Sequence, residues 1–214
     1  MEMRDPTKPL PEPQGPRAVG VIQDRVDDWT GILAWRTVPV GHADEAPLEV
    51  LSWLLANGRG TRMDDALYYK REIALDDNTF TWFGEREGLF GAYVTLAEPK
   101  LDKVEARVLE ILADVVDEPP TDAELHRAKQ AIRAGMLDAM ERPAGRAEAL
   151  AECFAVHGHV DCRAQRLARI QAVTADDVVR VVEDWIGPNQ RYSLSVVPQG
   201  STEALLGAEP VELP

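Results

Sequence analysis

The sequence contains little cysteine and no long hydrophobic run. Cys153 and Cys162 are its only cysteines, so no disulfide framework is implied. No apolar run approaches the ~20 residues that a membrane-spanning helix needs. The first 17 residues hold no hydrophobic region of the kind found in a secretory signal peptide. For the chain as it stands these absences predict a cytoplasmic protein without membrane contact; a longer precursor would change that prediction.

Positive charge is also scarce in this sequence. The chain has 23 Lys and Arg against 37 Asp and Glu, a formal net charge of -14. Nucleic acids and anionic membranes would repel such a surface, so we exclude both as partners. The acidic pairs Asp64–Asp65 and Asp76–Asp77 fall at predicted caps or turns, where solvation is the ordinary reason for them. Attraction of a basic partner is the alternative for the first pair.

Proline is concentrated at the start of the chain, where residues 1–16 are predicted to be an extended linker or tail because proline at this density prevents helix and central strand. The prolines in question are Pro6, Pro9, Pro11, Pro13 and Pro16. Residues 17–198 are long enough for one domain with a sizeable core. Residues 199–214 read as a second irregular tail.

The middle of the chain alternates between strand and helix patterns. Strands are predicted over 17–23, 30–38, 79–85, 88–98 and 190–198. Helices are predicted over 46–58, 61–72, 101–117, 121–142, 144–158 and 174–187. The helices predicted over 121–142 and 174–187 open with N-terminal capping patterns, Thr121 followed by Glu124 in the first and Thr174 followed by acidic residues in the second. This order predicts an α+β fold rather than a regular βαβ winding.

Four stretches, in this order, resemble the insulinase (pitrilysin-type) metallopeptidase family, which includes the mitochondrial processing peptidase. The likeness is to the second, non-catalytic half-domain of that family. The stretches are residues 43–67 (helix, Gly-rich turn and short helix), 88–99 (a strand), 119–142 (a long helix) and 170–198 (the closing helix and strand). Each match is loose alone, but the four together span most of the chain.

The resemblance implies a fold, a partner and a substrate class. In such enzymes two similar halves close around a peptide. One half carries zinc on an H-x-x-E-H motif whose Glu is the general base; the other half shares the fold without zinc and helps to grip the substrate. For this chain the resemblance implies a mixed, mostly antiparallel sheet of about five to six strands covered by a layer of helices. It also implies a zinc-bearing homologous half as partner and no cofactor on this chain. A homodimer of the isolated chain is a further expectation.

An H-x-x-E-A stretch begins at His42, one residue short of the zinc motif. In the family, however, the motif lies inside the first helix, a few residues before its terminal Gly. Counting back from Gly58 places the two ligand histidines at Glu49 and Trp53 and the catalytic glutamate at Ser52. Because indole cannot bind zinc and a hydroxyl cannot replace the carboxylate base, we predict no metal site and no catalytic residue on this chain.

The family's non-catalytic half usually supplies an Arg, and a Tyr seven residues later, to contact the substrate. The matching positions here are Tyr68 and Leu75, and Arg71 or Lys70 is the candidate replacement for the missing positive charge. We therefore take Tyr68 and Arg71 as the candidate substrate-binding residues. The alternative is that this segment only packs and is solvated.

A second candidate metal site is the cluster of Cys153, His157, His159 and Cys162, because two thiolates and two imidazoles can hold zinc tetrahedrally. The spacing is not that of a zinc finger. The simpler interpretation is two small buried thiols beside a helix C-terminus, where histidine suits the helix dipole.

Three functional hypotheses remain. The first is the non-catalytic half of a two-part zinc metallopeptidase, which completes the chamber and helps to bind peptide. The second is a pseudo-peptidase that scaffolds a complex, and the replacement of the gripping pair by Tyr68 and Leu75 favours it. The third is a half-chamber recruited to other chemistry, which no residue supports directly.

Overall fold

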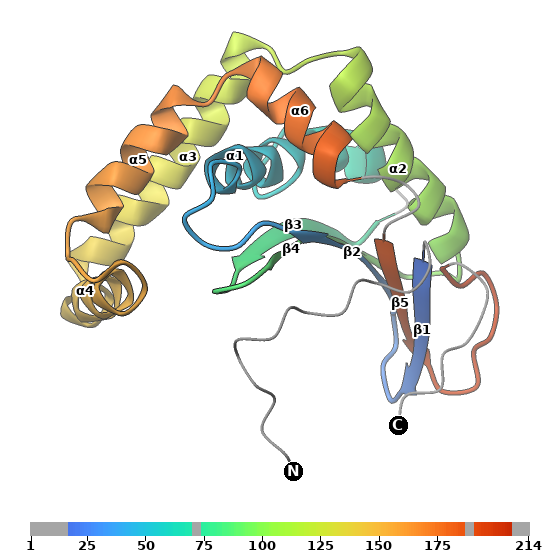
Figure 1. Cartoon of the computed structure of the whole chain (residues 1–214). Coiled ribbons are helices and arrows are strands. Elements are labelled where there is room, and N and C mark those ends of the chain that lie inside the picture. Colours follow the sequence, from blue (N-terminus) through green and yellow to red (C-terminus); the bar gives the residue numbers. More distant parts are fainter. Residues whose placement is uncertain (1–16, 70–73, 187–190, 207–214) are drawn as a thin grey trace.

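The computed structural model describes residues 17–69, 74–186 and 191–206, which form one sheet and a layer of helices on one of its faces (Figure 1). The sheet has five strands in the order β1-β5-β2-β4-β3. Their bounds are β1 Arg17–Asp24, β2 Trp29–Thr37, β3 Asp76–Phe83, β4 Gly88–Leu96 and β5 Arg191–Pro198. β1 runs parallel to β5, and the other neighbours are antiparallel. The predicted α+β class and the mixed, mostly antiparallel sheet are confirmed.

The helical layer contains six α-helices and one short π-helix in the described residues. Their bounds are α1 Glu45–Leu55, η1 Asp64–Tyr69, α2 Leu101–Asp117, α3 Asp122–Glu141, α4 Pro143–His157, α5 Cys162–Ala172 and α6 Ala175–Trp185. α1 lies against β3, and α2 and α6 lie over β2. α4 sits at the outer end of the layer, against α3 and α5 (Figure 1). None of these helices is both long and apolar enough to cross a membrane.

The N-terminal caps predicted for two helices are present. At α3, Thr121 Oγ1 accepts from the backbone N–H of Glu124, while the Thr121 N–H donates to the Glu124 carboxylate. At α6, Thr174 and Asp177 repeat this reciprocal pair. Each cap satisfies backbone donors that a helix start leaves open, which fixes where these helices begin.

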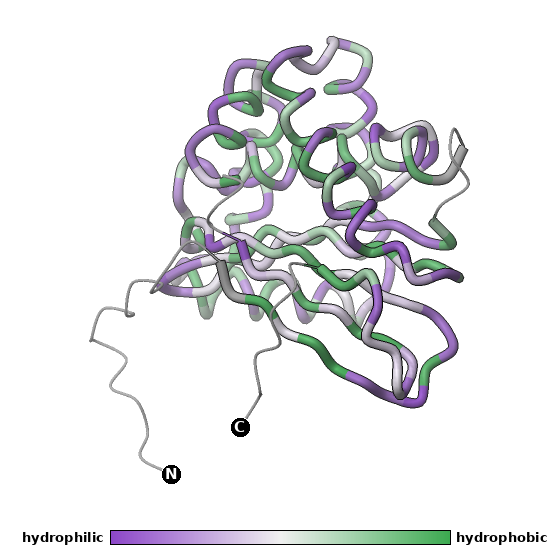
Figure 2. Tube along the Cα trace, turned by 90° about the vertical axis from the view of Figure 1, so that its right-hand side faces the viewer, coloured by the Kyte–Doolittle hydropathy of each residue, from purple (hydrophilic) through white to green (hydrophobic). Residues whose placement is uncertain are grey.

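The core lies between the sheet and the helices. Alternate residues of β2 and β4 point into it, so Trp35 and Phe90 are both fully buried, with ring centroids 6.1 Å apart. The leucines of α1 belong to the same hydrophobic core cluster as these two rings. In Figure 2 the strands carry long hydrophobic stretches, whereas the helices alternate between hydrophobic and hydrophilic positions. This pattern is expected of helices that bury one face.

The other face of the sheet carries no helix in the described part of the chain (Figure 1). Its alternate strand positions include Phe80, Trp82 and Tyr192, whose exposed fractions are 37%, 58% and 37%. β3 is an edge strand and pairs only with β4 among the described strands. The open face and this edge are where an extended chain has access to the sheet.

Three local predictions differ from the structure. β3 begins at Asp76, three residues before the predicted strand, because an edge strand tolerates an acidic residue such as Asp76 that faces solvent. The predicted helix over 61–72 becomes the π-helix η1 over Asp64–Tyr69 in its described part. Helix α5 was not predicted from the sequence, because its composition is strongly polar and its one buried residue is Ile170.

Candidate functional site

The first candidate site is the helix that would hold zinc in a catalytic half. In α1, Glu49 is 7% exposed and forms a bidentate ion pair with Arg166 of α5, with Nε–Oε2 and Nη2–Oε1 distances of 3.1 and 2.8 Å. Burial lowers the pKa of Arg166, but the charge and hydrogen bonds of Glu49 outweigh it and raise that pKa above its ordinary value. The Glu49 carboxylate, which stands at the position of the first zinc ligand, is therefore paired with the guanidinium of Arg166.

Ser52, at the position of the catalytic glutamate, is part of a buried hydrogen-bond network. Ser52 Oγ lies 3.0 Å from Thr79 Oγ1 of β3, and Thr79 Oγ1 donates to the Ser52 carbonyl at 2.7 Å. Asn57 Nδ2 donates to the Thr79 carbonyl at 2.9 Å and to Ser52 Oγ at 3.2 Å. Trp53 packs against the hydrophobic core. The three motif positions thus serve packing, hydrogen bonding and an ion pair.

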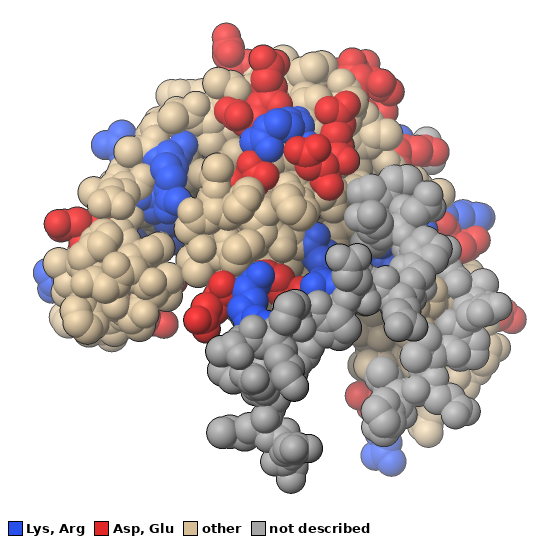
Figure 3. Space-filling model, viewed as in Figure 1, with Lys and Arg blue, Asp and Glu red and all other residues tan. Residues whose placement is uncertain are grey.

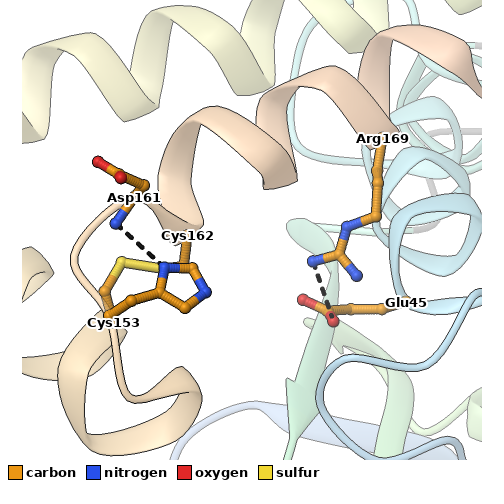
Figure 4. Close-up of a disulfide and its surroundings, with 6 residues drawn as sticks. Glu45, Cys153, Asp161, Cys162 and Arg169 are labelled. Carbon is orange, nitrogen blue, oxygen red and sulfur yellow. Dashed lines mark hydrogen bonds and ion pairs between the residues drawn. A yellow bond between two sulfur atoms is a disulfide. The ribbon is translucent and has the colours of Figure 1, made fainter.

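Further ion pairs fix the start of α1 to α5 and α6. Asp44 Oδ1 lies 2.7 Å from Arg180 Nη2, and Asp44 Oδ2 accepts from Trp185 Nε1 at 3.0 Å. Burial raises the pKa of Asp44, but these hydrogen bonds and the Arg180 charge together hold it below its usual value. Glu45 lies 3.8 Å from Arg169 (Figure 4). Figure 3 shows acidic and basic side chains side by side over α6.

His42 lies in the loop before α1, outside the helix. Its Nδ1 is 3.7 Å from Asp44 Oδ2, and its ring meets Trp185 edge-on. No group of three or more His, Cys, Asp and Glu side chains able to hold a metal ion occurs in the described residues.

The second candidate site is a cavity of about 330 Å³ at the N-terminal end of edge strand β3. Its lining comes from the loop after α1, from η1 and from the start of β3. The lining residues are Asn57, Gly58, Arg59, Asp64, Leu75, Asp76, Asp77 and Asn78. Three carboxylates, one guanidinium and two amides thus surround a space large enough for a peptide side chain.

Local contacts hold the walls of this cavity in place. Asn57 adopts φ 67°, a left-handed conformation that Asn tolerates, and this turns the chain after α1. The N–H of Gly60 donates to Asp64 Oδ2 at 2.8 Å. Arg62 donates to Glu124 Oε1 at 3.0 Å and to the carbonyl of Glu118 at 2.9 Å, so the segment that leads into η1 is bound to the helical layer.

The cavity is electrostatically unfavourable to its own carboxylates. Burial, and next the charges of Asp64 and Asp76, raise the pKa of Asp77 to about 6. No donor in the described part of the chain reaches the buried Oδ1 of Asn78. A cation or hydrogen-bond donor would therefore be favoured here.

This raised pKa predicts how stability varies with pH. An acid whose pKa is higher in the folded state stabilises the fold fully below its unfolded pKa of 3.8, and this contribution is lost as pH rises through about 6. Between pH 4 and 8 the wild type should therefore lose about 1 kcal/mol of its free energy of unfolding through Asp77, after allowance for solvent screening. Asp77→Asn should lack this pH-dependent loss. Urea unfolding at pH 4, 6 and 8 measures it, with the exposed Asp65→Asn as control. Parallel curves for Asp77→Asn and wild type would contradict the prediction.

The predicted substrate-binding residues are only partly described. Tyr68 lies within η1, and only its place in that helix is described; Lys70 and Arg71 lie outside the described residues. Leu75 is 52% exposed and lines the cavity. Asp77 and Asn78 were not among the predicted site residues. Their one sequence signal, acidic residues directly before a strand, is common at ordinary turns.

The prediction of two free thiols is wrong, because Cys153 and Cys162 form a disulfide with Cα atoms 5.5 Å apart (Figure 4). Two cysteines nine residues apart meet here because α4 and α5 pack together across a short turn. Disulfide sulfurs are not thiolates and cannot act as the zinc ligands considered for this cluster. His157 and His159 lie beside each other, with ring centroids 6.0 Å apart.

The family profile described as Peptidase M16 inactive domain matches residues 3–132 of the 214. The match covers more than half of the chain, so the chain belongs to this family. This confirms the resemblance to a non-catalytic metallopeptidase half-domain. No curated protein matches the chain.

Solved structures share the fold. A protease from Helicobacter pylori matches with a TM-score of 0.81 and 18% identity over 92% of this chain and 48% of its own. A peptidase M16 inactive domain from Pseudomonas fluorescens matches with a TM-score of 0.74 and 17% identity over 92% and 47%. An inactive peptidase domain from Bordetella parapertussis matches with a TM-score of 0.72 and 21% identity over 86% and 98%. The chain spans about half the length of the first two.

Proposed function

We propose that this chain is the non-catalytic half of a two-part zinc metallopeptidase. Its partner is a homologous half that carries the zinc, either as a separate subunit or as another part of a longer chain. The chain completes the chamber and holds an extended peptide. The observation that carries the proposal is α1, where buried Glu49, paired with the partly exposed Arg166, stands at the expected metal position of an M16 fold.

The edge of β3 supports the peptide-binding part of the proposal. An extended peptide can add to an exposed sheet edge through main-chain hydrogen bonds, while neighbouring pockets select its side chains. Beside β3 lie the cavity of about 330 Å³ and the exposed side chains of Leu75 and Trp82. Together they offer backbone pairing, an apolar contact and one polar pocket along a single edge.

Reconstitution tests this proposal. The full chain is mixed with the zinc-bearing homologous half, and turnover of an extended fluorogenic peptide is followed. We expect turnover to rise at least about a hundredfold over that of the zinc-bearing half alone, because a complete chamber positions the substrate. The chain alone should not cleave the peptide. Equal turnover with and without the chain would refute the proposal.

Surface variants show whether the β3 edge is the part that binds. Leu75→Asp with Trp82→Asp should raise KM for the peptide about tenfold or more, because it removes two apolar contacts and adds charge beside an acidic cavity. The matched control is Val26→Asp, which changes a residue 37% exposed between β1 and β2. Equal KM values for the two variants would locate peptide binding elsewhere.

A scaffold without peptidase function is the second candidate, and the exposed Leu75 at the gripping tyrosine position favours it. The substitutions Tyr68→Arg and Leu75→Tyr distinguish the two. A peptidase accessory should gain peptide turnover with the zinc-bearing half when this pair is restored, whereas a scaffold should keep its partner and gain no turnover.

A further inference from the structure

Helix α4 has little noncovalent attachment to the rest of the molecule. Of its 15 residues only Ala149 and Cys153 are buried. No hydrogen bond or ion pair joins an α4 side chain to another element in the described residues. Figure 3 shows that the surface of α4, at the lower left, is almost free of charged atoms on this face.

The side chains that α4 turns to solvent include large apolar ones. Leu150 and Phe154 are 45% and 65% exposed, and Val156 is 46% exposed. A helix with this surface gains little from burial where it stands. Apolar packing alone therefore explains poorly why α4 is held against α3 and α5.

The neighbouring helix α5 is anchored in several ways. Arg163 Nη2 donates to the carbonyl of Met136 in α3 at 2.9 Å, and Arg166 pairs with Glu49 of α1. Lys129 of α3 donates to the carbonyl of Gln171 at 3.0 Å. α5 is thus a fixed support to which another helix can be attached.

The disulfide makes that attachment. Cys153 lies in the last two turns of α4 and is 1% exposed, while Cys162 is the first residue of α5 and is partly exposed. Gly158, with φ 72°, ends α4 and lets the chain turn back within four residues. The bond joins the weakly packed helix to the anchored one.

We propose that the Cys153–Cys162 disulfide is a permanent clamp on α4, and that the protein acquires it in an oxidising compartment rather than in the cytoplasm. Disulfides form and persist in oxidising compartments and are rare where thiol reductants are abundant. The cytoplasmic location predicted from the sequence rested in part on the lack of a disulfide framework, whereas the structure contains a disulfide. This proposal is independent of the peptidase role.

The oxidation is a thiol–disulfide exchange with an oxidised thiol oxidoreductase of that compartment. One cysteine thiolate attacks the disulfide of the oxidoreductase, which forms a mixed disulfide and releases one oxidoreductase thiolate. The second cysteine thiolate then attacks the sulfur of the first cysteine in this mixed disulfide and displaces the other oxidoreductase thiolate. Two electrons pass to the oxidoreductase, which leaves as a dithiol, and the two cysteines lose their protons.

The proposed compartment is tested by measuring whether Cys153 and Cys162 are oxidised in the cells that make the protein. Cells are quenched in acid, free thiols are alkylated with a maleimide-polyethylene glycol, and the full-length protein is separated by size with and without prior reduction. We expect both cysteines to resist alkylation until they are reduced. Alkylation of both cysteines without reduction in more than half of the molecules would overturn the proposal.

Hydrogen–deuterium exchange of the purified protein tests the clamp. Reduction with a phosphine should raise the exchange rate of α4 amides on the order of fiftyfold, the loop-closure effect expected for so short a cross-link. α1 amides, which lie in the core, should change little. Cys153→Ala with Cys162→Ala should reproduce the reduced pattern without reductant. Unchanged α4 exchange in both experiments would show that the disulfide does not hold the helix.

Discussion

Replacing Glu105 by Gln is expected to lower the free energy of unfolding by about 3 kcal/mol. Glu105 lies in α2 and Arg191 in β5, and the side chains are 10% and 8% exposed. Arg191 donates to Glu105 Oε1 through Nε at 3.0 Å and through Nη2 at 2.8 Å, and Ser193 Oγ donates to the same oxygen at 3.2 Å. The substitution leaves the buried Arg191 charge without this carboxylate, which costs far more than an exposed pair is worth.

The control for this prediction lies on the same helix. Glu110 pairs with Arg107 at 2.8 Å, but its side chain is 60% exposed. Glu110→Gln should therefore change the free energy of unfolding by no more than about 0.5 kcal/mol. Urea unfolding at pH 7 measures both variants. Similar losses for Glu105→Gln and Glu110→Gln would mean that burial of the first pair has no energetic consequence.

Replacing Trp35 by Ala is expected to cost about 4 kcal/mol of stability. Trp35 is fully buried in β2, with its ring centroid 6.1 Å from that of Phe90 of β4, and belongs to the same core cluster as the leucines of α1. Its removal loses the transfer free energy of an indole and leaves a cavity that strands on both sides prevent from collapsing. Thermal and urea unfolding of the full chain give the value.

Trp82→Ala provides the comparison, because Trp82 lies in β3 with 58% of its surface exposed. We expect a stability change of no more than about 1 kcal/mol. Under the proposed function the same variant should weaken peptide binding by the reconstituted enzyme. A stable protein with impaired binding would separate the role of the β3 edge from that of the core, whereas a large stability loss would contradict the exposure of this residue.

Much of the fold could be predicted from local sequence patterns. The capping pairs at Thr121 and Thr174 mark the starts of α3 and α6. The alternation in β2 and β4 marks strands with one buried face. These patterns extend over only a few residues. The predicted elements are present in the structure because tertiary packing buries the same faces that the patterns make apolar.

The candidate site was harder to predict, because its residues meet only in the folded chain. The sequence could place Glu49 at a ligand position of the zinc motif, but its partner Arg166 is 117 residues away. The acidic cavity combines residues of three separate elements, and each of its carboxylates looks like an ordinary turn residue in the sequence. Helix α5 was missed because its stability comes from contacts with α1, α3 and α4 rather than from its own apolar pattern.

By itself, the sequence determined that this is an α+β half-domain of the M16 peptidase family whose first helix contains no H-x-x-E-H motif. Those features follow from residue types at fixed local spacing, which the chain carries whether or not it is folded. Only the tertiary structure decided that Cys153 and Cys162 join, that Glu49 pairs with Arg166 and that a cavity opens beside β3. Each of these depends on distances between separate elements, and such distances are set by how helices and strands pack.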